Sequence, residues 1–287
     1  MMKVRKAVIA VAGWGIRFLP ITKAQPKEML PLVDKPLIQY SVEEAINSGI
    51  EQVILVTALG KRAIEDYFDR SFELEYVLER KGETKRLQEM RELSDLVNVC
   101  YIRQKEQLGL GHAILTAKDI IGEEPFAVLL PDDIVDSKVP VLKQMIKVYE
   151  QYKTNIVAVE RIDRQDTTKY GIIEPKKISG HMYQVLSLTE KPEPSQAPSN
   201  LGVVGRYILV PQIFDVLEVT PPGKNQEIQL TDALQLLIKR QAILAYEFEG
   251  VRYDTGTPLG WLKATMAFAL KRPDIGQELR EYLRQLL

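Results

Sequence analysis

Cysteine is almost absent from this sequence, since Cys100 is the single cysteine among 287 residues. It cannot form a disulfide within the chain, which fits a reducing compartment. Long apolar runs are also missing. No stretch of about 18 apolar residues is available to span a membrane, and the apolar run after MMKVRK is too short for a secretory signal peptide. These absences predict a cytoplasmic protein that does not associate with a membrane.

An excess of charge of either sign is missing too. The 38 lysines and arginines nearly balance the 39 aspartates and glutamates, so the net charge is −1. No overall positive field exists to attract nucleic acid, and we expect no nucleic-acid partner. The hydrophobic content of 45% is ordinary for a globular protein, and the length suffices for one large α/β domain or two small ones.

What the chain does contain is a regular alternation of apolar, β-branched segments with amphipathic ones. The first kind predicts strands at Ala7–Ala12, Val53–Thr57, Val97–Ile102, Phe126–Leu130, Ile156–Val159, Val203–Val210 and Ile243–Phe248. The second kind predicts helices at Pro36–Ser48, Lys61–Phe68, Thr84–Leu93, Gly111–Ile120, Val139–Gln151, Leu230–Arg240 and Leu259–Leu270. Such alternation predicts an α/β fold with a doubly wound, Rossmann-like, mainly parallel sheet and helices on both faces. Its ligand is expected at the carboxyl ends of the strands.

The stretch after the first predicted strand is rich in glycine, proline and basic residues. It reads GWGIRFLPITKAQPKEMLPLVDKP. A glycine turn at Gly13 and Gly15 lets backbone N–H groups approach a phosphate, and Arg17 and Lys27 add positive charge. A dinucleotide-binding motif is excluded because Phe18 stands where the third glycine is required, and no Walker P-loop is present. The glycines alone are equally typical of an ordinary connection, but the added cations and prolines favour a loop that binds a triphosphate.

Carboxylates follow two further segments. The predicted strand that ends at Leu130 runs into Asp132 and Asp133, and Asp254 stands before a glycine in YDTG. A carboxylate at the end of a buried strand needs a metal or hydrogen-bond donors, and Mg²⁺ prefers one or two carboxylates together with phosphates and water. The alternative for Asp133 is a helix cap, and the alternative for Asp254 is a simple turn.

Two other strand ends carry polar side chains. Gln104 offers a donor and an acceptor that match the edge of uracil or thymine, and the nearby Gly109 lets the backbone approach a flat base. Glu190 is able to accept hydrogen bonds from sugar hydroxyls, and Lys191 is a point charge for a phosphate. From the residues alone, a solvated loop and a surface ion pair remain the simpler interpretations of these two places.

Taken together, the segments resemble the sugar-1-phosphate nucleotidylyltransferase family, and most closely its bacterial UTP–glucose-1-phosphate uridylyltransferases. The likeness starts in the loop described above and continues in IQYSVEEAINSGI, GKRAIEDYFD, LGLGHA, LLPDD, YGII, TEKP, PSNLGVVGRY, EIQLTDA and YDTGT. It covers nearly the whole chain. One departure lies in the glycine turn, where the family usually has G-L-G-T-R and this chain has Gly13-Trp14-Gly15-Ile16-Arg17, so a threonine hydroxyl is replaced by the aliphatic Ile16.

The resemblance implies a nucleotidyltransferase fold of the glycosyltransferase-A-like type. It implies one catalytic domain over residues 1–272, with a nucleotide-binding part at about 1–135 and a sugar-binding part at about 136–258. Residues 273–287 form a C-terminal helix with Leu279, Leu283 and Leu286 on one stripe, which packs on the core or on a partner subunit. A homodimer or a homotetramer is expected from the resemblance.

The resemblance also assigns roles to single residues. It places nucleotide binding on Ala12, Gly13, Gly15, Gln104 and Gly109, sugar binding on Gly171, Glu190 and Val203, Mg²⁺ on Asp132 and Asp254, and catalysis on Arg17, Lys27 and Lys191. Glu227 and Asp232 are expected to cap the helix at 230–240 and to order the wall of the site.

The implied reaction transfers UMP from UTP to glucose 1-phosphate and gives UDP-glucose and pyrophosphate. A sugar phosphate is a competent nucleophile near neutral pH, so the reaction requires no general base and the presence of only two histidines is no obstacle. Two alternatives stay open. One is a related enzyme that uses dTTP or another sugar 1-phosphate, and the other is a non-catalytic protein that binds a UDP-sugar, which Ile16 makes conceivable.

Overall fold

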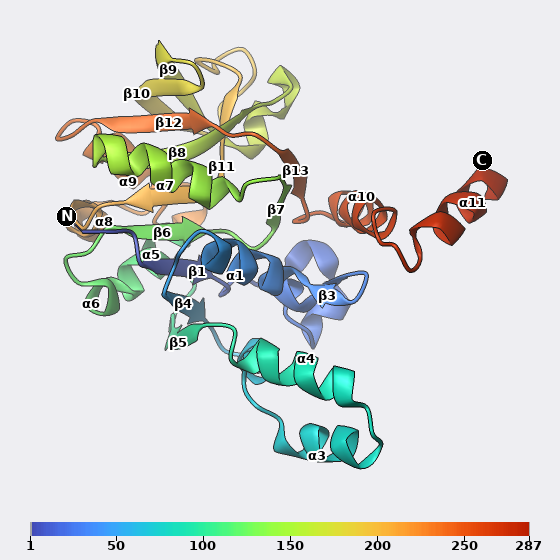
Figure 1. Ribbon diagram of the computed structural model, residues 1–287. Coiled ribbons are helices and arrows are strands. Elements are labelled where there is room, and N and C mark those ends of the chain that lie inside the picture. Colours follow the sequence, from blue (N-terminus) through green and yellow to red (C-terminus); the bar gives the residue numbers. More distant parts are fainter. Residues whose placement is uncertain (1, 287) are drawn as a thin grey trace.

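A nine-stranded mixed sheet forms the centre of the molecule in a computed structural model, which describes residues 2–286 (Figure 1). Its strands lie in the order β5 (Asn98–Arg103), β4 (Gln52–Thr57), β1 (Lys6–Ala10), β6 (Phe126–Leu129), β11 (Leu201–Leu209), β8 (Asn155–Arg161), β12 (Ile243–Glu247), β10 (Met182–Glu190) and β9 (Gly171–Ser179). Strands β11 and β10 run antiparallel to their neighbours, and the other seven share one direction. The predicted mainly parallel sheet is confirmed.

Helices cover both faces of this sheet. The α-helices of the described residues are α1 (Leu37–Asn47), α2 (Arg62–Phe68), α3 (Phe72–Arg80), α4 (Thr84–Ser94), α5 (Leu110–Thr116), α6 (Lys118–Ile121), α7 (Val141–Tyr152), α8 (Gln212–Val219), α9 (Leu230–Leu237), α10 (Pro258–Ala269) and α11 (Gly276–Leu286). Helices α5, α6, α8 and α9 lie on one face, and α1, α2 and α7 lie on the other. Successive residues of a strand point to opposite faces. In β1, Val8 therefore packs with residues of α5, α8 and α9, whereas Ala7 and Ile9 pack with residues of α1, α2 and α7.

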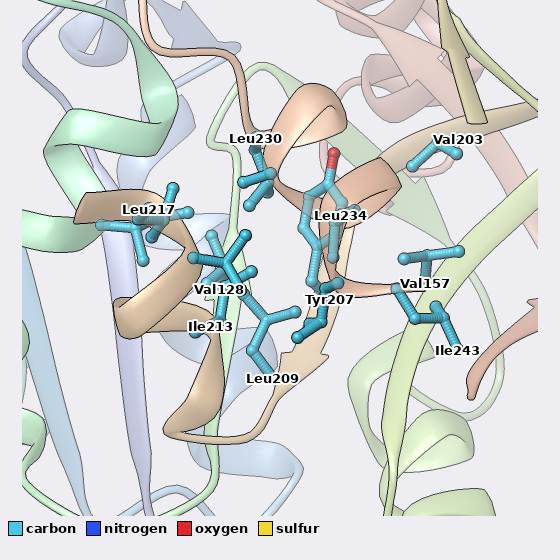
Figure 2. Close-up of a cluster of buried hydrophobic side chains, with 14 of the residues drawn as sticks. Val128, Val157, Val203, Tyr207, Leu209, Ile213, Leu217, Leu230, Leu234 and Ile243 are labelled. Carbon is cyan, nitrogen blue, oxygen red and sulfur yellow. The ribbon is translucent and has the colours of Figure 1, made fainter. Parts of the chain in front are cut away.

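Figure 2 shows the first of these two cores. Leu217 of α8 and Leu230 and Leu234 of α9 lie over Val128 and Tyr207 of the sheet. All of these side chains are buried. Strands that are covered on both faces need continuous apolar runs rather than alternating ones, which is why the sequence pattern identified β1, β4 and β6.

A small antiparallel pair joins two parts of the chain that are distant in sequence. Strand β7 (Asp133–Asp136) pairs with β13 (Val251–Asp254), and Asp254 lies opposite Asp133 in the register. The alternative interpretation of Asp133 as a helix cap is wrong, because this residue begins β7 instead. A second short pair consists of β2 (Pro31–Leu32) and β3 (Lys35–Pro36).

The C-terminal helix forms as expected, but it is not packed on the core. Helices α10 and α11 extend away from the sheet, and the chain ends there (Figure 1). Leu279 and Leu283 of α11 are only half-buried, and Leu286 is exposed. Along residues 2–286, no helix is both long and apolar enough to cross a membrane.

Candidate active site

A cleft of about 440 Å³ opens at the carboxyl ends of the parallel strands, where the fold class places a ligand. Eight of the residues singled out from the sequence line it: Ala12, Gly13, Gly15, Arg17, Lys27, Gln104, Gly109 and Asp132. They come from the ends of β1, β5 and β6 and from the loops that follow. The structure therefore gathers the predicted nucleotide-binding residues and two of the three predicted catalytic residues in one place.

The glycine-rich loop forms one wall of the cleft. Gly15 has a φ of 68°, and its carbonyl accepts hydrogen bonds from the backbone of Phe18 at 2.9 Å and from the hydroxyl of Thr22 at 2.8 Å. A side chain at Gly15 would crowd Thr22 and Lys27 at 3.0–3.1 Å. The tight turn directs the Arg17 guanidinium to the opposite wall, where Nη1 donates to the carbonyl of Gly256 at 3.3 Å.

Lys27 and Asp132 form an ion pair inside the cleft. Nζ of Lys27 lies 2.6 Å from Oδ2 of Asp132. Burial disfavours both charges, but each offsets this penalty for the other, so that the pKa of Lys27 is raised and the pKa of the Asp132 carboxyl is lowered. Both groups therefore remain ionised near neutral pH.

A second ion pair, between Glu28 and Lys61, lies next to Lys27. The next residue, Glu28, is 1% exposed, and its Oε2 lies 2.8 Å from Nζ of Lys61 at the start of α2. Burial raises the pKa of Glu28, and Lys61 and Lys27 oppose this effect. The pair fixes the short helical turn at Lys27–Met29 against α2 and so holds Lys27 toward the cleft.

Asp132 directly precedes β7 and Asp254 ends β13, so both carboxylates lie at the same end of this pair. A Cβ atom built on Gly256 would lie 3.0 Å from Oδ1 of Asp254, 3.2 Å from Oδ2 of Asp132 and 3.5 Å from Nη1 of Arg17. The two carboxylates and the guanidinium thus approach one point that only a glycine leaves open. The backbone N–H and the hydroxyl of Thr255 both donate to the Asp132 carbonyl at 2.8 Å, which ties the two turns together.

The end of the cleft that is predicted to bind the base is built around Gln104, which is 3% exposed. Its Nε2 donates to the Gly109 carbonyl at 3.2 Å and lies 2.8 Å from Nδ1 of His112. These contacts use both amide hydrogens and leave the carboxamide oxygen to accept from a base. Gly109 has a φ of 96°, and a Cβ there would lie 2.8 Å from Glu227, so the backbone approach depends on glycine.

The predicted sugar-binding residues lie on β9, β10 and β11, which we call the sugar-side wall, and they are not among the residues that line the 440 Å³ cleft. Glu190 pairs with Gly171 across β10 and β9, and a Cβ on Gly171 would lie 3.4 Å from Oε2 of Glu190. Lys191 has a φ of 46°, a strained conformation for a lysine, and its Nζ lies 2.9 Å from Oε1 of Glu190. Val203 is 8% exposed and packs in the core of Figure 2, one residue after Gly202, which pairs with Ile172 of β9.

One residue beside the cleft carries no signal in the sequence that sets it apart. Gln107 donates to the Ala12 carbonyl at 3.0 Å. Ile16, at the departure from the family pattern, and the nearby Trp14 line the cleft with 70% and 67% exposure. Glu227 also lines the cleft, and this position is compatible with its expected role in ordering the wall of the site. The expectation that Glu227 and Asp232 cap α9 is wrong, because Gln229 rather than either carboxylate residue occupies the N-cap position.

Comparison with known proteins agrees with this geometry. Residues 6–270 match the nucleotidyl transferase family. The chain belongs to this family. Among curated members, it is 52% identical over 286 residues to a UTP–glucose-1-phosphate uridylyltransferase of Staphylococcus epidermidis, which covers 100% of this chain and 99% of that protein. It is 53% identical over 285 residues to the UTP–glucose-1-phosphate uridylyltransferase YngB of Bacillus subtilis, with 99% and 96% covered.

Solved structures of nucleotidyl transferases have the same fold. A UDP-glucose pyrophosphorylase complexed with UDP-glucose matches with a TM-score of 0.87 at 47% identity, over 94% of this chain and 100% of that one. The UTP-bound enzyme from Acinetobacter baumannii matches with a TM-score of 0.92 at 42% identity, over 99% and 100% of the two chains. The similarity therefore extends over nearly the whole chain.

Proposed function

We propose that this nucleotidyl transferase is a UTP–glucose-1-phosphate uridylyltransferase, which forms UDP-glucose and pyrophosphate. The observation that carries this proposal is the cleft itself. It combines a base-recognition end at Gln104, a cationic phosphate loop with Arg17 and Lys27, and Asp132, whose carboxylate approaches that of Asp254 beside Gly256 at the edge of the cleft. Relatives of the same length that are about half identical carry this activity in their names.

The arrangement supports a division of roles among the residues of the site, which we infer as follows. Ala12, Gly13, Gly15, Gln104 and Gly109 bind UTP, while Gly171, Glu190 and Val203 bind the glucose. Arg17 neutralises the charge that develops on the departing pyrophosphate, and Lys27 stabilises the α-phosphate in the transition state. Lys191 holds the phosphate of glucose 1-phosphate, whose oxygen attacks the α-phosphorus. Such transfers depend on positioning and charge neutralisation rather than on covalent chemistry.

The carboxylate pair fits a magnesium ion. Among the described residues, no group of three or more potential metal ligands is clustered. Asp132 and Asp254 nevertheless converge on one point, and Mg²⁺ typically uses one or two carboxylates together with substrate phosphates. When bound, the ion would neutralise phosphate charge. We propose that these two aspartates hold it.

The decisive experiment is to measure pyrophosphate release with glucose 1-phosphate, Mg²⁺ and each of UTP, dTTP, ATP, CTP and GTP. We expect release with UTP far above the others, and its loss in EDTA. A preference for dTTP would instead indicate the related thymidylyl transfer.

A second candidate rests on Ile16, which lines the phosphate loop and is 70% exposed. Its side chain offers no hydroxyl to a phosphate, which is compatible with a UDP-sugar-binding protein without catalysis. Absence of turnover with every nucleotide, together with binding of UDP-glucose, would favour this candidate over the enzyme.

We also propose an oligomer and a location. Leu279, Leu283 and Leu286 of α11 form an apolar stripe that the described part of the chain covers only in part, which supports a homodimer or homotetramer. The single free cysteine supports a cytoplasmic location. Within the chain, we propose that residues 1–135 serve the nucleotide and residues 136–258 the sugar.

A further inference from the structure

Arg252 lies outside the cleft lining, yet it contacts both sides of the site. It projects from β13, two residues before Asp254, and its side chain is 7% exposed. Nε donates to Oδ1 of Asp133 at 2.5 Å, and Nη1 donates to Oε1 of Glu160 at 2.5 Å and to the Tyr170 hydroxyl at 3.2 Å. The guanidinium also lies 5.0 Å from the centre of the Tyr170 ring.

The first partner belongs to the carboxylate side. Asp133 follows Asp132 directly, and its Oδ2 accepts from the backbone of Gly205 at 2.8 Å. Below it, the fully buried Arg206 donates to the carbonyls of Leu130 at 3.0 Å and Asp133 at 2.7 Å. The turn that presents Asp132 is therefore fixed at both ends, and Arg252 links it to the strand that carries Asp254.

The other partners belong to the sugar-side wall. Tyr170 precedes Gly171, and its carbonyl accepts from the backbone of Lys191 at 3.0 Å. Glu160 lies opposite Gly202 in the pairing of β8 with β11, next to Val203. Movement of Arg252 would thus displace the backbone on which the predicted sugar-binding residues stand.

Opposite charges stabilise the contacts that Arg252 makes. Burial alone would lower the pKa of Arg252, but Asp133 and Glu160 raise it, so the guanidinium stays charged. Planar bidentate geometry allows an arginine to hold three partners in fixed directions, which a lysine cannot do.

We propose that Arg252 is a positioning residue that sets the sugar-side wall at the correct distance and angle from the Asp132–Asp254 pair. This inference rests on the proposed function. It implies that Arg252 affects glucose recognition and turnover, while the base-recognition end at Gln104 is independent of it.

Two variants test the proposal, and the chain offers matched controls. Arg252→Lys keeps the charge but loses the geometry, and Tyr170→Phe removes one hydroxyl while leaving both ion pairs intact. A similar trio elsewhere on the sheet supplies the controls, since Arg161 bonds Tyr183 at 3.0 Å and Glu247 at 2.9 Å without touching Asp133. Arg161→Lys and Tyr183→Phe are the matched substitutions.

Binding is measured by calorimetry of UDP and of UDP-glucose in EDTA, so that no metal enters the comparison. In the unaltered chain we expect UDP-glucose to bind more tightly than UDP. We call the ratio of the affinity for UDP-glucose to the affinity for UDP the glucose increment. It is expected to fall about tenfold in Tyr170→Phe and further in Arg252→Lys, because hydrogen bonds to a charged group are lost. UDP affinity stays within about twofold, and neither control changes the increment.

Steady-state kinetics provide the second readout. Arg252→Lys is expected to lower kcat by about a hundredfold, as for a misplaced reacting group. Addition of Tyr170→Phe to Arg252→Lys has little further effect, because both changes break the same link. If the glucose increment of Arg252→Lys and Tyr170→Phe equals that of the controls Arg161→Lys and Tyr183→Phe, the proposal is overturned. An unaltered chain that forms no UDP-glucose would overturn the proposed function instead.

Discussion

Lys27→Ala is the substitution whose consequences the structure defines most completely. Lys27 lies 2.6 Å from Asp132 in the cleft and, by the proposed role, meets the α-phosphate in the transition state. Loss of one such charge contact lowers kcat by about 10²–10³-fold. The pair is 22% and 27% exposed, so the loss of unfolding free energy should be about 1–2 kcal/mol, below that of a fully buried pair.

The same substitution has a second effect of opposite sign. Lys27 neutralises Asp132 and lowers the pKa of its carboxyl. Without the ammonium group, Asp132 presents a full negative charge, and the Mg²⁺ concentration that gives half-maximal activity should fall about threefold. A variant that is merely misfolded would lose both metal affinity and turnover.

The assay is pyrophosphate release at saturating UTP and glucose 1-phosphate over a series of Mg²⁺ concentrations. Lys23→Ala is the matched control, since Lys23 is an exposed lysine of the same loop. A kcat for Lys27→Ala within threefold of the control would refute the assignment of Lys27 to the transition state. Weaker rather than stronger apparent Mg²⁺ affinity would refute the competition between Lys27 and the metal.

Three other predictions follow. Ile16→Thr restores a hydroxyl to the phosphate loop and should raise kcat by about tenfold, measured as pyrophosphate release, and an unchanged rate would show that the backbone donors suffice. Gln104→Leu removes the free acceptor and should raise the KM for UTP by about tenfold with little change in kcat, and an unchanged KM would exclude Gln104 from base recognition. Arg70 and Arg91 lower the pKa of Glu75 to about 2, so their stabilising contribution is present above about pH 4.5 and is lost as the pH falls through about 2. Glu75→Gln should therefore lower the Tm at pH 7, with a difference that vanishes in acid, and a Tm difference independent of pH would contradict the linkage.

The sequence was most informative where one physical cause sets both pattern and structure. Strands β1, β4 and β6 are buried on both faces, so their continuous apolar runs appear directly in the sequence. Helix α3 was not predicted because its apolar residues, such as Phe72 and Tyr76, are exposed and Glu75 is buried. Its helical form depends on contacts with α4 rather than on a core-facing stripe.

The carboxylate pair shows what local reasoning misses. From the sequence, a helix cap was a simple alternative for Asp133. In the structure this residue begins β7, because β13, which is distant in sequence, pairs with it. Only this pairing brings Asp254 to Asp132. Strand β13 was not among the predicted strands, and the two-residue alternation of VRYD does not show which strand would be its partner.

Arg252 illustrates the same limit at the level of single side chains. Within its own segment it is an ordinary basic residue of a short strand, and nothing nearby in the sequence marks it. Its importance follows from three partners on three other segments, Asp133, Glu160 and Tyr170. A buried charge requires counter-charges, and the fold can supply these from segments that are distant in the sequence. The residues that hold the two sides of this site together are therefore those whose function only the tertiary structure reveals.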